Sequence, residues 1–277
     1  PQIQNLQTKT DSIQDYHSKK CISASGLKLI FKKSVYHYLN KKPIQSKSLD
    51  LGIATHIMVY EGYEEFLKQY FIMQKLDLRR KEDKEIKEKL LKKADGKILL
   101  SQDDDTIIRG IYENHIRSEI AQKYSNGDIE ISHYGQYEGI DVRVRPDCIA
   151  KDKSWISDVK TCQDSSPRAF RMDLYKWSYH LQAVFYCDMI GVNPLNFRFI
   201  ACETNYPYQV QVYSLSEDLV EKGREGYRSA FKYWKMYLND GIVPGFIGEY
   251  NKDGSIIIPN VIRPYMNNIE KISSISS

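Results

Sequence analysis

The chain has 277 residues, which suits one large domain or two small ones and is ample for a buried core. Charged residues make up 27% and hydrophobic residues 42% of the chain, so its composition is that of an ordinary globular protein. The net charge of +4 permits an anionic partner without demanding one, because nucleic-acid-binding domains are often more basic. The charge is spread along the chain, so any basic surface has to be assembled by folding.

The cysteines and the apolar runs exclude several classes of protein. The five cysteines are odd in number, widely spaced and without a CxxC pair, which indicates reduced thiols and excludes a disulfide framework, a zinc site or an iron–sulfur cluster. No apolar run approaches 18 residues, so no membrane span is expected. The polar start, PQIQNLQTKTDSIQDY, does not have the pattern of a signal peptide.

The first half of the chain is predicted to be mainly helical. We expect residues 1–20 to be loosely ordered, and Ser25 to cap a helix over GLKLIFKKSVYHYL. Further helices are predicted over LDLGIATHIMVYEG, ending near Gly62, over YEEFLKQYF, over the charged stretch LRRKEDKEIKEKLLKKADG, and over SQDDDTIIRGIYENHIRSEIAQKY with Ser101 as its cap. In the charged stretch, opposite charges at i,i+4 spacing are typical of a solvated helix face.

The pattern changes to alternation after residue 127. Strands are predicted over DIEISHYG, GIDVRVRPDCIA and SWISDVKT, followed by a helix from about Pro167 to Gly191. The strands NFRFIACET and YQVQVYSL then form a hairpin with NYP as its turn, and a long helix runs over SEDLVEKGREGYRSAFKYWKMYLND. We therefore expect one α/β domain over 1–277, made of 1–20, a mainly helical part at 21–127, an α/β core at 128–239, and a tail at 240–277 that contains the apolar run SIIIPNVI.

Three charged residues lie in two of these short strands. If KDKS is a symmetric hairpin loop centred on Asp152 and Lys153, then Asp147 faces Asp158 across the hairpin. Directly opposed side chains have Cβ atoms about 4.5–5.5 Å apart, so the two carboxylates repel each other. Asp158 and Lys160 share one face of their strand because they are two residues apart. The hairpin thus gathers two carboxylates and one ammonium, provided that it contains no bulge.

Two converging carboxylates need a proton or a cation to offset them. Oxygen ligands of this kind favour Mg²⁺, with Mn²⁺ as a possible substitute. Such an ion polarises a phosphoryl oxygen and lowers the pKa of a bound water, and a neighbouring lysine can orient or deprotonate that water. The three residues therefore suit the hydrolysis of a phosphodiester. Taken alone, they are explained equally well by an ion pair on an exposed strand face.

The motif RPD…DVK resembles the signature of PD-(D/E)xK nucleases, with Asp147 and Asp158 as the acids and Lys160 as the lysine. YHLQAVFY resembles the QxxxY element of RecB-type nucleases, with Gln182 and Tyr186 one helical turn apart. LGIATHIMVYEGYEEFLKQY resembles the block of that group that carries a histidine, and ISASGLKLI followed by SVYHYL resembles the start of the RecE (exonuclease VIII) C-terminal nuclease and, more distantly, of lambda-type exonucleases. These blocks are in the expected order over residues 22 to about 187.

The resemblance implies a restriction-endonuclease-like α/β fold, with a central mixed β-sheet flanked by helices and an α-helical N-terminal part. It implies a Mg²⁺-dependent exonuclease that degrades one strand of linear double-stranded DNA from the 5′ end and leaves 3′ overhangs for recombination. The partners implied are DNA ends, further copies of the chain in a ring (a trimer or a tetramer) and a single-strand annealing protein. The resemblance also implies a bacterial or phage-encoded protein that acts in the cytoplasm.

The resemblance also assigns residues to these roles. His56 joins Asp147 and Asp158 as a metal ligand, and the backbone carbonyl of Val159 is a further ligand. The residues expected to contact DNA or its 5′-phosphate are Ser25, Lys19, Lys20, Gln182, Tyr186, Arg143 and Arg145. The two arginines share a face with Asp147, so they hold the DNA backbone or else pair with acids across the sheet. Glu130 could face the site, but a solvated strand surface suits it better.

Three alternatives remain open from the sequence. The first is another enzyme of the same fold, such as a RecB-like repair nuclease or an endonuclease. The second is a DNA-binding protein with a decayed site, which the intact pair of aspartates and the lysine disfavour. The third is a plain α/β protein in which the three charges form a surface cluster, and it predicts that no divalent ion binds.

Overall fold

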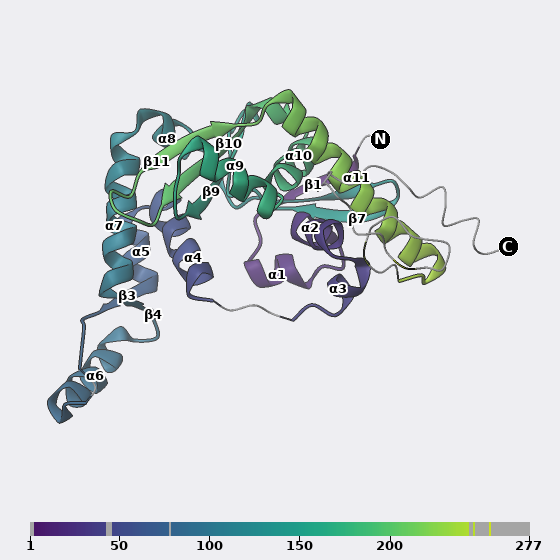
Figure 1. The fold of residues 1–277 in the computed structure, drawn as a ribbon. Helices are drawn as coiled ribbons and strands as arrows, with labels where there is room; N and C mark the ends of the chain where they lie inside the picture. Colours follow the sequence, from purple (N-terminus) through teal and green to yellow (C-terminus); the bar gives the residue numbers. More distant parts are fainter. Residues whose placement is uncertain (1–2, 43–45, 78, 244–245, 247–254, 256–277) are drawn as a thin grey trace.

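A computed structural model describes the chain except for residues 1–2, 43–45, 78, 244–245, 247–254 and 256–277 (Figure 1). The helices are α1 Ile13–Ser18, α2 Ala24–Lys32, α3 Val35–Leu39, α4 Lys47–Tyr60, α5 Tyr63–Gln69, α6 Lys81–Ala94, α7 Gln102–Arg117, α8 Glu119–Lys123, α9 Pro167–Lys176, α10 Tyr179–Ile190 and α11 Glu217–Asp240, with the short 3-10 helix Pro194–Asn196. The strands are β1 Gln4–Lys9, β2 Ile22–Ser23, β3 Tyr70–Met73, β4 Ile98–Ser101, β5 Asp128–Ile129, β6 Ser132–Tyr137, β7 Ile140–Val144, β8 Cys148–Ile149, β9 Ile156–Cys162, β10 Phe197–Glu203 and β11 Val210–Ser214.

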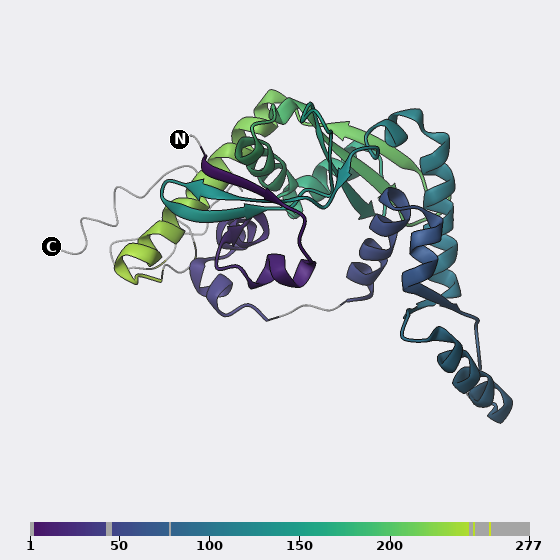
Figure 2. The ribbon, with the colours of Figure 1, turned by 180° about the vertical axis from the view of Figure 1, so that it is seen from behind.

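Two sheets share the α/β core. The larger has the strand order β11-β10-β9-β8-β5 and is mixed, because β10 runs parallel to β9 but antiparallel to β11. The smaller has the order β1-β6-β7-β2, and β1 forms its edge in the view from behind (Figure 2). The chain passes directly between the two sheets from β5 to β6 and from β7 back to β8. Both crossings lie next to the predicted carboxylates.

Helix α10 is the centre of the main core. Most of its residues are buried, and it is packed against α2, α9 and α11, with α11 running along its outer side (Figure 1). Gly223 of α11 allows this close approach, since a Cβ atom there would lie 2.6 Å from the carbonyl oxygen of His180. Phe185, Phe197 and Phe199 are among the largest side chains buried in this core.

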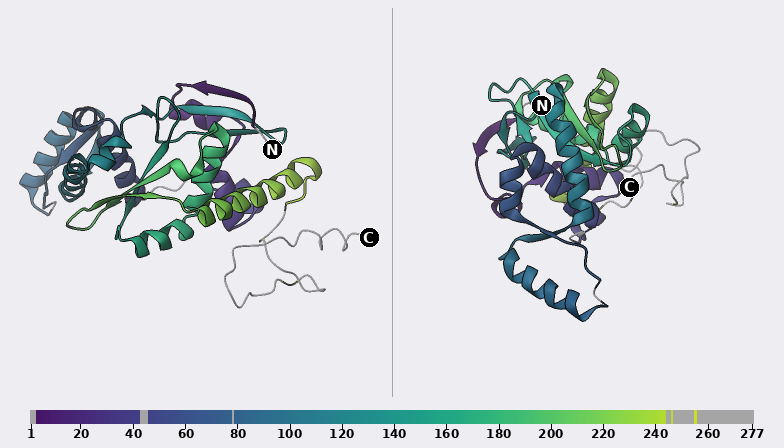
Figure 3. Two further views of the ribbon diagram at one scale, coloured as in Figure 1. Left: turned by 90° about the horizontal axis from the view of Figure 1, so that it is seen from above. Right: turned by 90° about the vertical axis from the view of Figure 1, so that its left-hand side faces the viewer.

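A helical layer packs on the other side of the larger sheet. Helix α4 contacts β9 and packs on α7, and Phe66 and Ile108 are fully buried between these elements. The parallel pair β3 and β4 leads out of this layer to α6, which projects from the rest of the molecule (Figure 1 and the right view of Figure 3). No helix in the described part of the chain is long and apolar enough to cross a membrane.

The predicted α/β class with a mixed sheet flanked by helices is confirmed, but several details of the elements were wrong. Residues 1–20, expected to be loosely ordered, contain β1 and α1. Ser23, not Ser25, caps α2 through its hydroxyl, and a separate helix α3 follows. The two long strands predicted between 128 and 150 each divide between the two sheets.

Two further elements differ from the prediction. The mainly helical part also contains the strands β3 and β4. The single helix predicted up to Gly191 is broken at Ser178, whose φ of 53° ends α9 and begins α10. Most of the predicted tail at 240–277, including the apolar run, lies outside the described residues. The division of the chain into one domain with these parts stays a prediction.

Candidate active site

The hairpin β8–β9 has the predicted register. Cys148 pairs with Ser157 and Ile149 with Ile156, around a four-residue loop over 151–154. One residue further out, Asp147 therefore lies opposite Asp158. An oxygen of Asp147, Oδ2, accepts a hydrogen bond of 2.9 Å from the backbone N–H of Val159, which ties the first carboxylate to the strand that carries the second.

Asp158 is buried because β9 is an inner strand of the larger sheet, with β10 on one side and β8 on the other. Its residue exposure is 1%, so its carboxylate depends on protein partners for compensation. Lys160 forms an ion pair with Oδ2, and the side-chain nitrogen of Gln182 donates to Oδ1 over 2.9 Å. The ammonium of Lys160 also lies 5.0 Å from the centre of the Tyr179 ring.

The electrostatics of the pair favour a bound cation. Burial, with the neighbouring charge of Asp158 as a second cause, raises the pKa of Asp147 to about 6. Burial disfavours the ammonium of Lys160, but the negative charges of Asp158 and Asp147 outweigh burial and raise its pKa. Lys160 is therefore charged at neutral pH. One ammonium faces two carboxylates, so the site is short of positive charge.

His56 fills the remaining side of the carboxylate pair. It comes from α4, the helix packed on β9, and its Nε2 lies 3.7 Å from Oδ1 of Asp147 and 3.8 Å from Oε1 of Glu130. Nε2 is buried and has no hydrogen-bond partner. The ring of Tyr60, one turn further along α4, packs edge-on against the imidazole of His56, with 4.8 Å between the two ring centres. This contact helps to fix the imidazole. An unpartnered buried nitrogen between two carboxylates is what a metal ligand requires.

Glu130 is the site residue that the sequence analysis undervalued. It lies at the crossing from β5 to β6 with a φ of 51°, and its N–H donates to the carbonyl of Asp147 over 3.0 Å. One of its carboxylate oxygens faces His56 and the other binds Arg145. The left-handed backbone turns Glu130 into the site, away from the solvated strand surface expected for it.

These residues fit a hard divalent cation. Carboxylate oxygens of Asp147, Asp158 and Glu130 and the imidazole nitrogen of His56 are ligands that Mg²⁺ or Mn²⁺ accepts. Across the described residues, no three such side chains already stand at the spacing of a formed metal centre. The predicted part of the Val159 carbonyl stays a prediction.

Gln182 and Tyr186, predicted from the QxxxY spacing, both belong to α10 and lie beside the carboxylates. Gln182 bonds to Asp158, and its oxygen accepts a hydrogen bond of 2.7 Å from Lys28. Tyr186 is buried, and burial raises the pKa of its hydroxyl far above the ordinary value. The burial of Tyr186 suits a structural contact better than a contact to DNA.

The predicted DNA contacts fall into two groups. Ser25, Lys19 and Lys20 are exposed near the start of α2, where a phosphate can reach them. Arg143, only 7% exposed, donates to the backbone carbonyls of Tyr16 and Lys19.

Arg145 is likewise turned to the protein. It donates to the carbonyl of Asp11 and binds the carboxylate of Glu130. The geometry thus favours the alternative in which the arginines serve the protein, and we assign neither of them to the DNA backbone.

The mixed sheet, the opposed aspartates and the lysine two residues on define a PD-(D/E)xK-type fold and site. Residues 23–251 match the family model described as "PDDEXK-like domain of unknown function (DUF3799)". The match covers most of the chain, which therefore belongs to this family and to the PD-(D/E)xK nuclease superfamily predicted from its motifs.

A solved structure shares the fold. It is the crystal structure of a protein from Eubacterium rectale described as a "Putative exonuclease", with a TM-score of 0.61 and 14% sequence identity. The similarity covers 86% of this chain and 90% of that one. No curated protein matches the chain.

Proposed function

We propose that the protein is a Mg²⁺-dependent exodeoxyribonuclease of the RecE type, which degrades one strand of linear double-stranded DNA from its 5′ end. The observation that carries this proposal is the pair of the partly exposed Asp147 and the buried Asp158, opposed across one hairpin with Lys160 beside it. Membership of the PD-(D/E)xK superfamily and the fold shared with a protein described as an exonuclease support it.

The chain's own residues divide the work. Asp147, Asp158 and His56 would hold the cation, with Glu130 as a further carboxylate in reach. When bound, the cation polarises the phosphoryl oxygen and lowers the pKa of the attacking water. Lys160, kept charged by the two aspartates, orients that water and balances the negative charge that develops on the phosphate.

Binding would depend on phosphates, because an exonuclease that moves along DNA cannot depend on sequence. Ser25, Lys19 and Lys20 are exposed at and just before the start of α2, and we assign the 5′-phosphate to them. We expect the affinity for DNA to fall steeply with salt concentration, as bound counterions are released. The ring of three or four copies, the annealing partner and the role in recombination belong to the same proposal.

A second candidate keeps the fold and the chemistry but differs in substrate. A RecB-like repair nuclease or an endonuclease would use the same aspartates and lysine, and would differ in how the DNA reaches them. A DNA-binding protein without activity is disfavoured because Asp147, Asp158 and Lys160 are all present and adjacent.

The test uses linear duplex DNA with 5′-phosphates and an internal label on each strand, with and without Mg²⁺. Wild type is compared with Asp158→Ala, Lys160→Ala and, as a matched control from the exposed loop of the same hairpin, Asp152→Asn. We expect Mg²⁺-dependent loss of the 5′-ended strands, abolished in the first two variants and retained in the control. Cleavage of closed circular DNA would favour the endonuclease. Binding without turnover would overturn the proposed activity.

A further inference from the structure

Lys28 has no role in the proposed chemistry so far, yet it binds Gln182, the residue that donates a hydrogen bond to Asp158. It comes from α2, more than 150 positions before α10, and its ammonium lies 2.7 Å from Oε1 of Gln182. The same ammonium lies 5.7 Å from the centre of the Tyr179 ring, and Lys160 lies 5.0 Å from that centre. Tyr179 therefore contacts both lysines.

The hydrogen bonds in this chain of contacts have only one possible direction. An ammonium only donates and an ionised carboxylate only accepts. Lys28 must therefore bond to the oxygen of Gln182, which leaves the amide nitrogen to donate to Asp158. If the amide turned over, its oxygen would face the carboxylate and its nitrogen would face the ammonium, and both contacts would be repulsive. Lys28 and Asp158 thus favour the same orientation of the Gln182 amide.

The position of Lys28 is fixed by the fold. Its neighbours Leu27 and Ile30 are fully buried, Ser23 caps the helix, and α2 packs on α10 and α11. Burial, with the nearby charge of Lys160 as a second cause, lowers the pKa of Lys28 to about 8. A shielded ammonium close to a second one costs free energy, and such costs are typical of functional sites.

We propose that Lys28 is a positioning residue, which locks the amide of Gln182 so that it donates to Asp158 and fixes that carboxylate for the cation. The part of this inference that concerns cleavage rests on the proposed function. The competing explanation is that Lys28 binds a DNA phosphate directly and leaves Gln182 unaffected.

The first test measures Mn²⁺ binding by the protein without DNA, from the electron paramagnetic resonance signal of free Mn²⁺. Removal of a nearby positive charge would by Coulomb's law alone tighten the binding of a cation. Loss of a group that orients a metal ligand weakens it, so we expect Lys28→Met to raise the dissociation constant about tenfold. Lys28→Arg, which keeps charge and donors, should recover part of the affinity. Unchanged or tighter binding in Lys28→Met would overturn the inference.

The second test is a double-mutant cycle on DNA cleavage. Lys28→Met should lower kcat about tenfold in the wild type. It should have less than about a twofold effect in a Gln182→Leu background, because its action passes through that amide. The matched control is Lys32→Met, one turn along α2, where the ammonium binds the carbonyl of Lys176 and faces Trp177. It should cleave like wild type.

A full effect of Lys28→Met in the Gln182→Leu background, seen mainly in KM, would mean a direct phosphate contact and would overturn the positioning role. The Mn²⁺ measurement separates the two proposals. If the wild type does not cleave DNA, the proposed function fails, and the weakened Mn²⁺ binding of Lys28→Met still decides the role of Lys28.

Discussion

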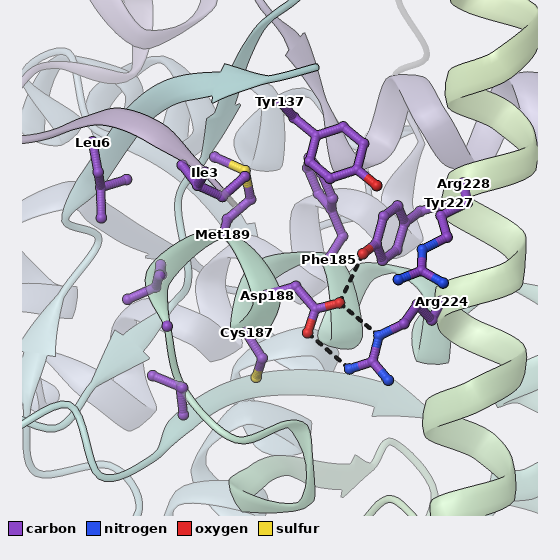
Figure 4. Close-up of a pocket in the computed structure, with 13 residues that line it drawn as sticks. Ile3, Leu6, Tyr137, Phe185, Cys187, Asp188, Met189, Arg224, Tyr227 and Arg228 are labelled. Carbon is purple, nitrogen blue, oxygen red and sulfur yellow. Dashed lines mark hydrogen bonds and ion pairs between the residues drawn. The ribbon is translucent and has the colours of Figure 1, made fainter. Parts of the chain in front are cut away.

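Two carboxylate clusters lie against helix α10, and they differ in how their charge is balanced. Asp188, near the end of the helix, accepts two hydrogen bonds of 2.9 Å from the guanidinium of Arg224 and one of 2.7 Å from the hydroxyl of Tyr227 (Figure 4). This Asp188 cluster lines a cavity of about 520 Å³ between α10, α11 and the smaller sheet. Its one negative charge meets one positive charge in bidentate geometry.

The site around Asp147 and Asp158 has the opposite character. Two carboxylates share one lysine, and the nitrogen of His56 beside them is buried without a partner. The Asp188 cluster is complete within the protein and stabilises the contact of α10 with α11. The aspartate pair has no such balance among the described residues, which is the reason that we propose a cation there. Unbalanced charge, and not the mere presence of acids or of a cavity, distinguishes the proposed site from the Asp188 cluster.

The largest expected difference between the clusters is in activity. His56→Ala removes a proposed metal ligand, and we expect the cleavage rate to fall about 100-fold, since loss of one ligand weakens both metal binding and its geometry. Asp188→Asn should cleave within about threefold of wild type, because the Asp188 carboxylate binds Arg224 and Tyr227 of α11. Both rates are measured on linear duplex DNA at saturating Mg²⁺. Equal losses of cleavage rate in the two variants would contradict the proposal that only the cluster with Asp147 and Asp158 is catalytic.

For the free energy of unfolding, we expect the larger effect from the Asp188 cluster. Asp188→Asn leaves the guanidinium of Arg224 half-buried without its charged partner, so the free energy of unfolding should fall by about 2 kcal/mol. Glu221→Gln is the matched control, because Glu221 reaches the same guanidinium only at 3.7 Å and is exposed. It should cost less than about 0.5 kcal/mol in urea unfolding. A comparable loss in the control would show that the bidentate geometry contributes little.

The smallest effect concerns pH. The pKa of Asp147 rises from 3.8 to about 6 on folding, so its contribution to stability is present at low pH and is lost as the pH rises through 6. Asp147→Asn, which stays neutral, should therefore stabilise the metal-free protein at pH 7. This advantage should disappear toward pH 4 and reverse in Mg²⁺. A difference in stability that stays constant with pH would contradict the raised pKa of Asp147.

The hairpin could be predicted from the sequence because its register depends on local information. An even loop fixes which residues face each other, and strand alternation fixes which share a face. Strand β1 could not be predicted, because all six of its residues are exposed and its polar sequence, QNLQTK, has no apolar alternation. It forms by pairing with β6, more than 120 positions away.

The rest of the site depends on packing and on one unusual backbone angle. Lys28 and Gln182 meet only because α2 packs on α10, and nothing in either stretch of sequence indicates the other. Glu130 adopts a left-handed φ although it is neither a glycine nor an asparagine. The sequence therefore did not indicate that its side chain turns toward the aspartates. Motifs in the sequence pointed to Asp147, Asp158, His56 and Gln182, whereas no motif pointed to Glu130 or Lys28.

Gly223, on α11, is a position at which the packing of α10 is sensitive to substitution. A single methyl group there would collide with the backbone of α10 at His180, two residues before Gln182. The helix would have to move outward, and the amide that Asp158 depends on would move with it. The amide that binds Asp158 thus depends on a close helix contact on the opposite side of the core. A mutation in a helix that touches no ligand could therefore silence the site and leave every catalytic group intact.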